Sequence, residues 1–283
     1  MKKLKYLLLA FLISPIATFA QTTNNEMNTN SENDILIGVS ITQEELDASK
    51  NYTEDTILGT NTKTIATTRK YDALGNIVYS QSKELTSDEE LLIENNDNVH
   101  ILENGKLEKM EQNNSRASVY WRYETESKEI TIYYVKYSSG NYGIQLTNSW
   151  KINPINHSYD IIAARWTKSK GTSTYTVSGK QTPTVLNPYV EYTESASSNN
   201  IVKYNYGAGI SQNLYDDYAP LTNYLSITSA NDFGTEIYGT YQHAVRSVTL
   251  AQSKAYTISS SGLGGVVLHN YPSYYDGMTG VYS

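Results

Sequence analysis

The chain has 283 residues, a net charge of −7 at pH 7, no cysteine and 26 tyrosines. The absence of cysteine excludes a disulfide framework, a thiolate metal site and a cysteine nucleophile, so stability must come from an ordinary hydrophobic core. The lack of a basic excess argues against nucleic acid as a partner, because lysine and arginine have to neutralise the phosphates.

Residues 1–20, MKKLKYLLLAFLISPIATFA, have the pattern of a signal peptide. Basic residues at the start are followed by an apolar run from Tyr6 to Ile13, a proline and small residues, with cleavage expected before Gln21. The run is shorter than the ~20 residues that cross a bilayer, so we expect no transmembrane segment. The sequence therefore predicts a secreted, extracellular bacterial protein.

The composition changes near residue 115. Residues 21–114 carry a net charge of −11, whereas residues 115–283 carry +1 and hold 22 of the 26 tyrosines and all three tryptophans. The polar stretch 111–118 is typical of a linker. We therefore predict a signal peptide at 1–20, a disordered polar tract at 21–33, a small acidic α+β region or prosegment at 34–114, and a Tyr-rich β-sandwich domain at 115–283.

In the acidic region, DILIGVSI, residues 34–41, predicts a short strand. Residues 62–85 predict a β-hairpin, because two strand-like runs flank a turn at 72–76 that contains Gly75. This region therefore contributes strands as well as helices.

Two short acidic helices are expected around these strands. In TQEELDASK, Thr42 is followed three residues later by Glu45, which is the spacing of a capping box. In SDEELLIEN, Ser87 and Glu90 have the same spacing. Each pair predicts where its helix begins.

After residue 115, turn signals recur roughly every 8–12 residues, between short runs rich in Tyr, Thr, Val and Ile. They lie at 126–128, 139–141, 170–171, 198–200, 230–232 and 253–254. Residues 168–182 predict a hydroxyl-rich hairpin. Residues 240–250 also fit a helical period, but the surroundings favour a strand. We predict an all-β fold, an antiparallel β-sandwich rich in tyrosine.

The tyrosines admit two interpretations. Cross-strand tyrosine pairs stabilise a sheet, because the ring packs on the pleated surface while the hydroxyl stays wet. Alternatively, the rings form a platform for a ligand, and sugars fit because their CH faces stack on rings and their hydroxyls bond to polar side chains. The candidate ligand-binding residues are Trp121, Tyr123, Trp150, Tyr271, Tyr274 and Tyr275.

The tryptophans differ in their expected placement. Trp166 shares a strand face with Ile162 and Ala164 and is expected in the core. Trp150, near a predicted strand end, is expected at the rim of a binding surface.

No motif predicts catalysis. The four histidines are far apart, and neither an HExxH nor a GxSxG pattern is present. His243 is interpreted as a hydrogen-bonded strand histidine, with a general base as the alternative. Glu191 and Glu236 are carboxylates that a cleft would need for glycoside hydrolysis. We predict no catalytic residue.

No metal site or cofactor is expected either. The oxygen-rich stretches 94–98 and 215–218 do not have the spacing of an EF-hand loop, and turns use the same residue types for local hydrogen bonds. The sequence does not define the oligomeric state.

The hypothesis that follows is a secreted bacterial binding protein whose β-sandwich presents aromatic side chains to a carbohydrate or cell-envelope polymer. Two alternatives remain open. One is a membrane-active β-toxin, in which residues 168–182 rearrange into an amphipathic hairpin. The other is a secreted hydrolase with a site assembled from distant residues.

Overall fold

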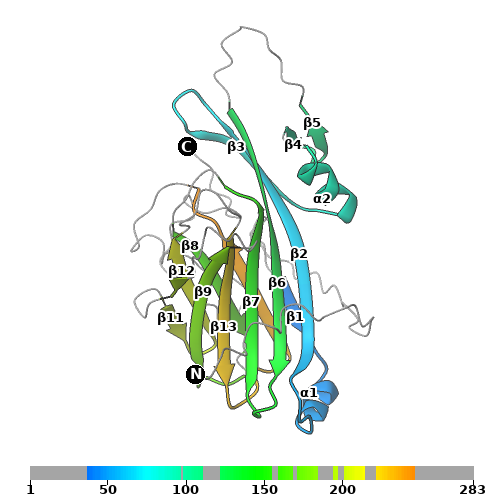
Figure 1. The fold of residues 1–283 in the computed structure, drawn as a ribbon, viewed down its shortest axis with the longest axis vertical. Helices are drawn as coiled ribbons and strands as arrows, with labels where there is room; N and C mark the ends of the chain where they lie inside the picture. The colour runs from blue at the N-terminus through cyan, green and yellow to red at the C-terminus, as the bar shows by residue number, and fades with distance from the viewer. Residues whose placement is uncertain are drawn as a thin grey trace, which may run out of the picture.

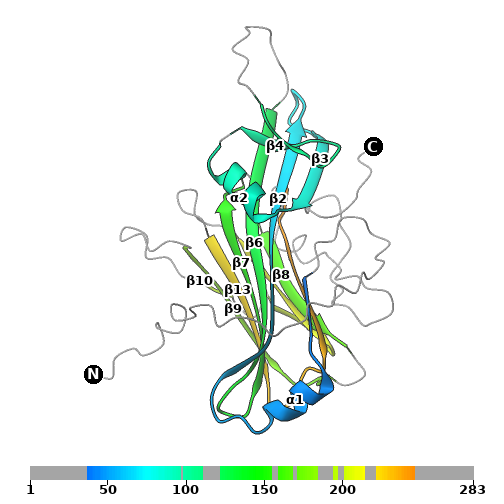
Figure 2. The ribbon, with the colours of Figure 1, turned by 90° about the vertical axis from the view of Figure 1, so that its right-hand side faces the viewer.

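The structure is a computed structural model that describes residues 37–96, 98–110, 122–154, 159–167, 171–183, 194–196, 201–213 and 221–245. Two large antiparallel sheets pack face to face (Figures 1 and 2). The predicted antiparallel β-sandwich is therefore confirmed. The predicted signal peptide, the tract 21–33 and the linker 111–118 lie outside the described residues.

The larger sheet has seven strands in the order β10-β9-β13-β7-β6-β2-β3. In chain order these are β2 (Thr56–Tyr71), β3 (Ile77–Glu84), β6 (Arg122–Lys136), β7 (Tyr142–Ile152), β9 (Thr176–Pro183), β10 (Glu194–Ser195) and β13 (Leu221–Ser229). The upper parts of β2, β3 and β6 extend beyond the smaller sheet in Figure 2.

The smaller sheet has five strands in the order β1-β14-β8-β12-β11. These are β1 (Ile37–Ser40), β8 (Tyr159–Trp166), β11 (Ile201–Tyr204), β12 (Gly207–Asn213) and β14 (Glu236–Gln242). Strands β4 (Val99–Ile101) and β5 (Leu107–Lys109) form a separate pair. Helices α1 (Gln43–Ser49) and α2 (Ser87–Glu94) complete the described elements.

Both predicted helices are present. The capping box of α1 is confirmed, because Glu45 N donates to Thr42 Oγ1 at 3.1 Å and Thr42 N donates to Glu45 Oε2 at 2.7 Å. For α2 the predicted pair was wrong by one residue: Thr86 is the extended N-cap residue, and its backbone N donates to Glu89 Oε2 at 3.1 Å.

The predicted hairpin at 62–85 is formed by β2 and β3. Its turn depends on Asp72, whose Oδ1 accepts hydrogen bonds from Leu74 N at 2.9 Å and Asn76 N at 2.8 Å. Gly75 has a φ of 81°, a left-handed conformation that glycine adopts without a steric penalty.

The turn predicted at 126–128 was wrong. Residues Arg122–Lys136 form one continuous strand, and Glu126 and Lys128 point into the sandwich, where both are only 1% exposed. A run of charged residues resembles a turn in the sequence, but here the charges are balanced inside the protein. A bulge in the pairing with β7 lies between Ser127 and Lys128.

The hairpin predicted at 168–182 was also wrong in its described part. Residues 176–183 form a single strand, β9, which pairs with β13 and β10 and not with the segment before it. The turns at 139–141 and 230–232 agree with the structure. Of the stretch 240–250, residues 240–242 belong to β14, which ends at Gln242, and residues 246–250 lie outside the described residues.

The change of composition near residue 115 does not coincide with a boundary between the sheets. Strand β1 pairs with β14 in the smaller sheet, and β2 pairs with β6 along its length in the larger sheet. Residues before and after 111–121 therefore share both layers of the sandwich.

The main core lies between the two sheets. It includes Ile37, Ile132, Leu146, Ile162, Trp166, Ile210, Leu225 and Ile237, all at most 1% exposed. Gly239 lets the layers approach closely, because a Cβ there would lie 2.7 Å from Leu146 Cδ1. A second cluster joins α2 and β4 to the extended part of β2 through Ala66, Leu85, Ile93, Val99 and Ile101.

We expect the chain to remain in one piece after a single cut between residues 111 and 118. A protease site engineered there should yield two fragments that co-elute in size-exclusion chromatography and separate only in denaturant, because each fragment holds strands of both sheets. Elution of a folded fragment that begins near residue 115, without its partner, would contradict this expectation.

Candidate functional site

The inner face of β6 changes from charged to apolar along the strand. From residue 124 to residue 134 its inward side chains are Glu124, Glu126, Lys128, Ile130, Ile132 and Tyr134, and all six are buried. One end of the sandwich interior is therefore an ordinary core, and the other holds ionisable groups.

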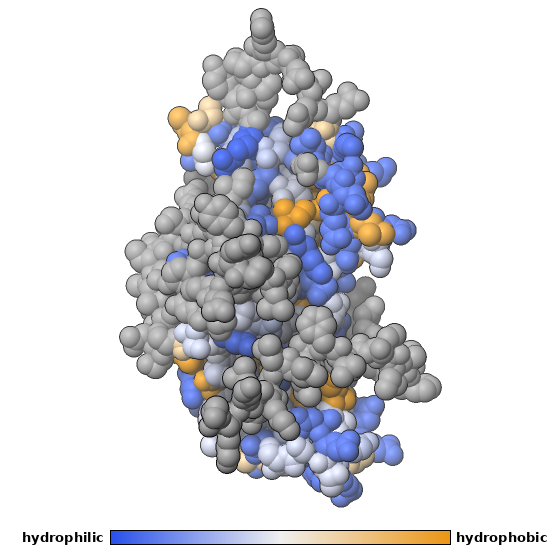
Figure 3. Space-filling model, in the orientation of Figure 1, coloured by the Kyte–Doolittle hydropathy of each residue, from blue (hydrophilic) through white to orange (hydrophobic). Residues whose placement is uncertain are grey.

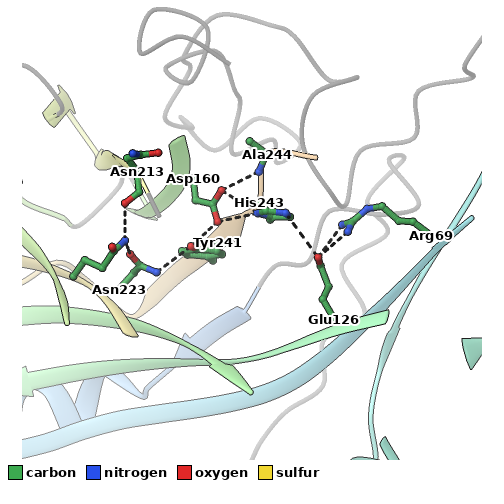
Figure 4. A network of polar contacts seen from close by, with 9 residues as sticks. Arg69, Glu126, Asp160, Asn213, Asn223, Tyr241, His243 and Ala244 are labelled. Atoms are coloured by element: carbon green, nitrogen blue, oxygen red, sulfur yellow. Dashed lines mark hydrogen bonds and ion pairs between the residues drawn. The ribbon is translucent and has the colours of Figure 1, made fainter. Parts of the chain in front are cut away.

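Asp160 on β8 and His243, which follows β14, form the centre of a buried polar network (Figure 4). Both carboxylate oxygens of Asp160 lie 3.0 Å from His243 Nδ1. The backbone N of Ala244 donates to Asp160 Oδ1 at 3.0 Å, and the Tyr241 hydroxyl donates to Oδ2 at 2.7 Å. The carboxylate thereby fixes the end of β14 against β8.

Glu126 connects this centre to the seven-stranded sheet. Its Oε2 lies 3.8 Å from His243 Nε2. The Arg69 guanidinium on β2 contacts both of its oxygens, with Nη2 to Oε1 at 2.9 Å and Nη1 to Oε2 at 2.8 Å. His243 therefore lies between two carboxylates from opposite sheets (Figure 4).

A chain of amides extends the network across the sandwich. Asn223 Nδ2 donates to the Tyr241 hydroxyl at 3.0 Å, and Gln181 Nε2 donates to Asn223 Oδ1 at 2.7 Å and to the carbonyl of Asn213 at 2.9 Å. The two amide side chains come from β13 and β9, and Asn213 on β12 contributes its backbone carbonyl. Both sheets therefore contribute polar groups to a single connected set.

Among the described residues, the charges buried at this end of the sandwich balance only when His243 is protonated. The ionisable side chains that the structure places in this network or beside it are Arg69, Lys128, His243, Glu124, Glu126 and Asp160. With a charged imidazole they comprise three basic and three acidic groups. Burial of an unbalanced charge is costly, so the composition of the cluster favours the imidazolium form.

The same balance shifts the pKa values. Burial alone would lower the pKa of His243, but Asp160 and Glu126 outweigh it, and the pKa is raised above 6.5. Burial alone would raise the pKa of Glu126, but Arg69 and His243 outweigh it and hold that pKa below 4.5. Each group therefore favours the charged form of the other.

Trp150 and Lys128 pack beside this network. The Lys128 Nζ lies 5.2 Å from the centroid of the Trp150 ring and 5.3 Å from that of Tyr241. Trp150 is 1% exposed and meets Tyr241 edge to face, with ring centroids 5.9 Å apart. The expectation that Trp150 lies at a rim was therefore wrong: its strand continues to Ile152, and the indole faces inward.

The other predicted residues have separate places. Trp166 is 0% exposed, as expected. Tyr123 is half-buried, with its ring 4.9 Å from the ring of His100 and the Lys70 Nζ 5.4 Å from its centroid. Of the remaining candidate ligand-binding residues, Trp121, Tyr271, Tyr274 and Tyr275 lie outside the described residues.

Of the two predicted carboxylates, Glu236 accepts a hydrogen bond from Thr167 Oγ1 at 3.0 Å, and Glu191 lies outside the described residues. An Asp–His pair resembles the acid–base part of a hydrolase, yet Asp160 and His243 are 1% and 0% exposed. A substrate has no direct approach to groups buried to this degree. Their geometry suits a structural connection between the sheets, and the interpretation of His243 as a hydrogen-bonded histidine agrees with it.

A different set of polar residues lies on the outside of the seven-stranded sheet. We call it the outer tyrosine face, and it consists of Thr131 and Tyr133 on β6, Gln145 and Thr147 on β7, and Tyr224 and Ser226 on β13. These alternate with inward core residues along each strand. All but Thr131 are half-buried, and none is charged. In Figure 3 the described surface is mostly hydrophilic, with small, separate hydrophobic patches.

The pairing registers order this face into two rows across the strands. Tyr133, Gln145 and Ser226 are directly opposite one another in the first row. Thr131, Thr147 and Tyr224 form the second row. The Gln145 Nε2 donates to the hydroxyl of Tyr137 at 2.9 Å, which orients the amide at the middle of the first row.

Sequence reasoning identified neither the network nor the outer tyrosine face. A signal for the network was present: Asp160 begins the apolar run DIIAARW, where a lone carboxylate requires a buried partner. For the outer face, the alternation of Thr131 and Tyr133 with apolar residues was visible, but Tyr224 is brought beside them only by the strand order.

Comparison with known proteins identifies no relative, since no family model, curated protein or solved structure matches the chain. Within the described segments, no helix has the length and apolar character needed to cross a membrane. The function must therefore be inferred from the two sets of residues described above.

Removing one partner of the Arg69–Glu126 pair should be strongly destabilising. We expect Arg69→Met to lower the free energy of unfolding by about 3–5 kcal/mol, because it leaves a buried carboxylate without its guanidinium. The Arg69→Met/Glu126→Leu double variant should lose less than the sum of the two single losses. Urea denaturation checks both values.

A matched control is the surface pair of Lys63 and Glu84, whose Nζ–Oε2 distance is 2.7 Å with side-chain exposures of 30% and 57%. Lys63→Met should cost about 1 kcal/mol or less. If Arg69→Met and Lys63→Met lowered the free energy of unfolding equally, the buried network would not stabilise the fold more than a surface ion pair does.

The raised pKa of His243 predicts a loss of stability at alkaline pH. The folded state binds the proton more tightly than the unfolded state, so this stabilisation is complete below pH 6.5 and is lost as the pH rises through the folded-state pKa. The free energy of unfolding, measured in urea from pH 6 upward, should fall in the wild type and fall less in His243→Gln.

His100 supplies the control for this measurement. Burial lowers its pKa, so its contribution has the opposite sign and diminishes as the pH falls. His100→Gln should leave the alkaline loss unchanged. An identical pH dependence in the wild type and His243→Gln would exclude a charged His243 in the folded protein.

Proposed function

We propose that the protein is a secreted binding protein that contacts a carbohydrate through the outer tyrosine face. The observation that carries the proposal is the arrangement of two half-buried tyrosines, Tyr133 and Tyr224, around the uncharged hydrogen-bonding side chains of Gln145, Thr147 and Ser226. Sugars present CH faces and hydroxyls together, and this face offers rings and polar groups together.

The two phenols support a role beyond packing. Among the described residues, neither the Tyr133 nor the Tyr224 hydroxyl has a hydrogen-bond partner. Other hydroxyls of the sheet are paired across strands: Thr62 with Thr131 at 3.0 Å, and Ser149 with Thr222 at 2.9 Å. Cross-strand pairing accounts for these threonines and serines. It leaves the tyrosine hydroxyls available to a ligand.

Binding is favoured over hydrolysis by the burial of the reactive groups. The Asp160–His243 pair is enclosed between the sheets, whereas the outer tyrosine face is part-exposed and lacks an ionisable pair suited to acid–base chemistry. A flat polar surface with two rings can hold a ligand without transforming it. The signal-peptide pattern of residues 1–20 is consistent with a protein that meets polysaccharides outside the cell.

Removing either ring should weaken carbohydrate binding. We expect Tyr133→Ala and Tyr224→Ala each to raise the dissociation constant for the best ligand of a glycan array by about tenfold, equivalent to about 1.4 kcal/mol. Isothermal titration calorimetry with that ligand measures the change.

Tyr52→Ala is the matched control, because Tyr52 is 53% exposed, follows α1 in the chain and does not belong to the outer tyrosine face. Its affinity should equal that of the wild type. Equal losses in all three variants, or binding that is insensitive to Tyr133 and Tyr224, would contradict the proposed site.

A further inference from the structure

The spacing of the two tyrosines restricts the size of the ligand that the proposed function requires. Tyr133 lies on β6 opposite Gln145, whereas Tyr224 lies on β13 opposite Thr147, with β7 between them. Across the sheet, the two Cα atoms are therefore separated by two strand spacings. Along the strands, they are separated by two residues. Strand spacing and rise place them about 12 Å from each other, which exceeds the width of one sugar ring.

The residues around and between the rings offer hydrogen bonds along this line. Gln145 and Thr147 on β7 occupy the interval, Ser226 lies beside Tyr224 on β13, and Tyr137 holds the Gln145 amide in place. Amide and hydroxyl groups both donate and accept. A chain of sugar rings that reaches from one tyrosine to the other would meet polar groups throughout its length.

The charges around the face argue for an uncharged ligand. Glu129 and Lys151 are paired at 3.2 Å, so neither offers a net charge. Lys180 on β9 is directly opposite Tyr224 and extends the second row by one strand. Its Nζ lies 4.9 Å from the centroid of the Tyr224 ring. A single exposed lysine that packs on a ring is a poor match for an anionic polymer, and it competes with a stacking ligand.

On these grounds, and resting on the proposed function, we infer that the ligand is an uncharged, extended oligosaccharide or polysaccharide that spans Tyr133 and Tyr224. A monosaccharide contacts one ring only. An anionic glycan finds no cluster of basic side chains among the residues described on this face.

The test uses the full mature chain with glucose oligomers of one to six rings, in both α-1,4 and β-1,4 linkage, beside polygalacturonate oligomers of the same lengths. Within at least one neutral series, affinity should rise at least tenfold between one ring and the length that first spans both tyrosines, then level off. Polygalacturonate should bind at least tenfold more weakly than the neutral oligomer of equal length.

Two variants separate the causes. In Tyr224→Ala the dependence on length should vanish, because only one ring remains. In Lys180→Gln the affinity for the neutral oligomer should not fall, since the lysine competes for the Tyr224 ring.

Each failure has a distinct meaning. Equal affinity for one ring and six rings, stronger binding of polygalacturonate, or a loss of affinity in Lys180→Gln overturns this inference while carbohydrate binding stands. Absence of binding to every glycan of a broad array overturns the proposed function and this inference together.

Discussion

The sandwich depends on a buried set of charges that joins its two sheets. Arg69 and Glu126 belong to the larger sheet, Asp160 belongs to the smaller one, and His243 directly follows β14 of the smaller sheet. Each carboxylate has a cation beside it, and the imidazole lies between the two carboxylates. Buried charges are tolerable only in such a closed arrangement, because any uncompensated member would carry the full cost of desolvation.

This network restricts the positions of the interior side chains more tightly than apolar packing alone would. Isoleucine and leucine side chains at the other end of the core can repack with little penalty, whereas a carboxylate between a guanidinium and an imidazole has one acceptable position. The network therefore fixes how β14 and β6 face each other across the sandwich. The outer tyrosine face lies on the reverse side of the seven-stranded sheet, where its rows follow from the pairing registers of β6, β7 and β13.

Much of the fold was predictable from local patterns. The capping box at Thr42 and the hairpin around Asp72 each follow from a few neighbouring residues, and both were correct. The turn expected at Glu126 was wrong because charge was taken as a sign of exposure, whereas the compensating Arg69 lies far away in the sequence. Which charged residues pair across the sandwich depends on the tertiary structure. The hydrophobic periodicity of the sequence carries no information about such pairs.

The sequence predicted the aromatic character of the candidate site but not the residues that form it. The abundance of tyrosine in strands indicated an aromatic face, but which rings lie on the same side of adjacent strands depends on the strand order. Tyr133 and Tyr224 are placed on one face by the pairing of β6 and β13 with β7, whereas Trp150, one of the predicted ligand-binding residues, faces the interior. Residue type predicted that such a face would be aromatic, while the strand order decided where it lies.

The pairing of β1 with β14 has a consequence for how the chain acquires its structure. Residues 37–40 at the start of the sandwich find their partners at 236–239, near its end. Contacts between such distant segments slow folding, because the entropic cost of closing a long loop comes before the contacts can stabilise the chain. The smaller sheet cannot be completed until β14, the last described strand, has been synthesised. A nascent chain that stops before residue 236 therefore lacks the partner of β1 and has no finished second layer.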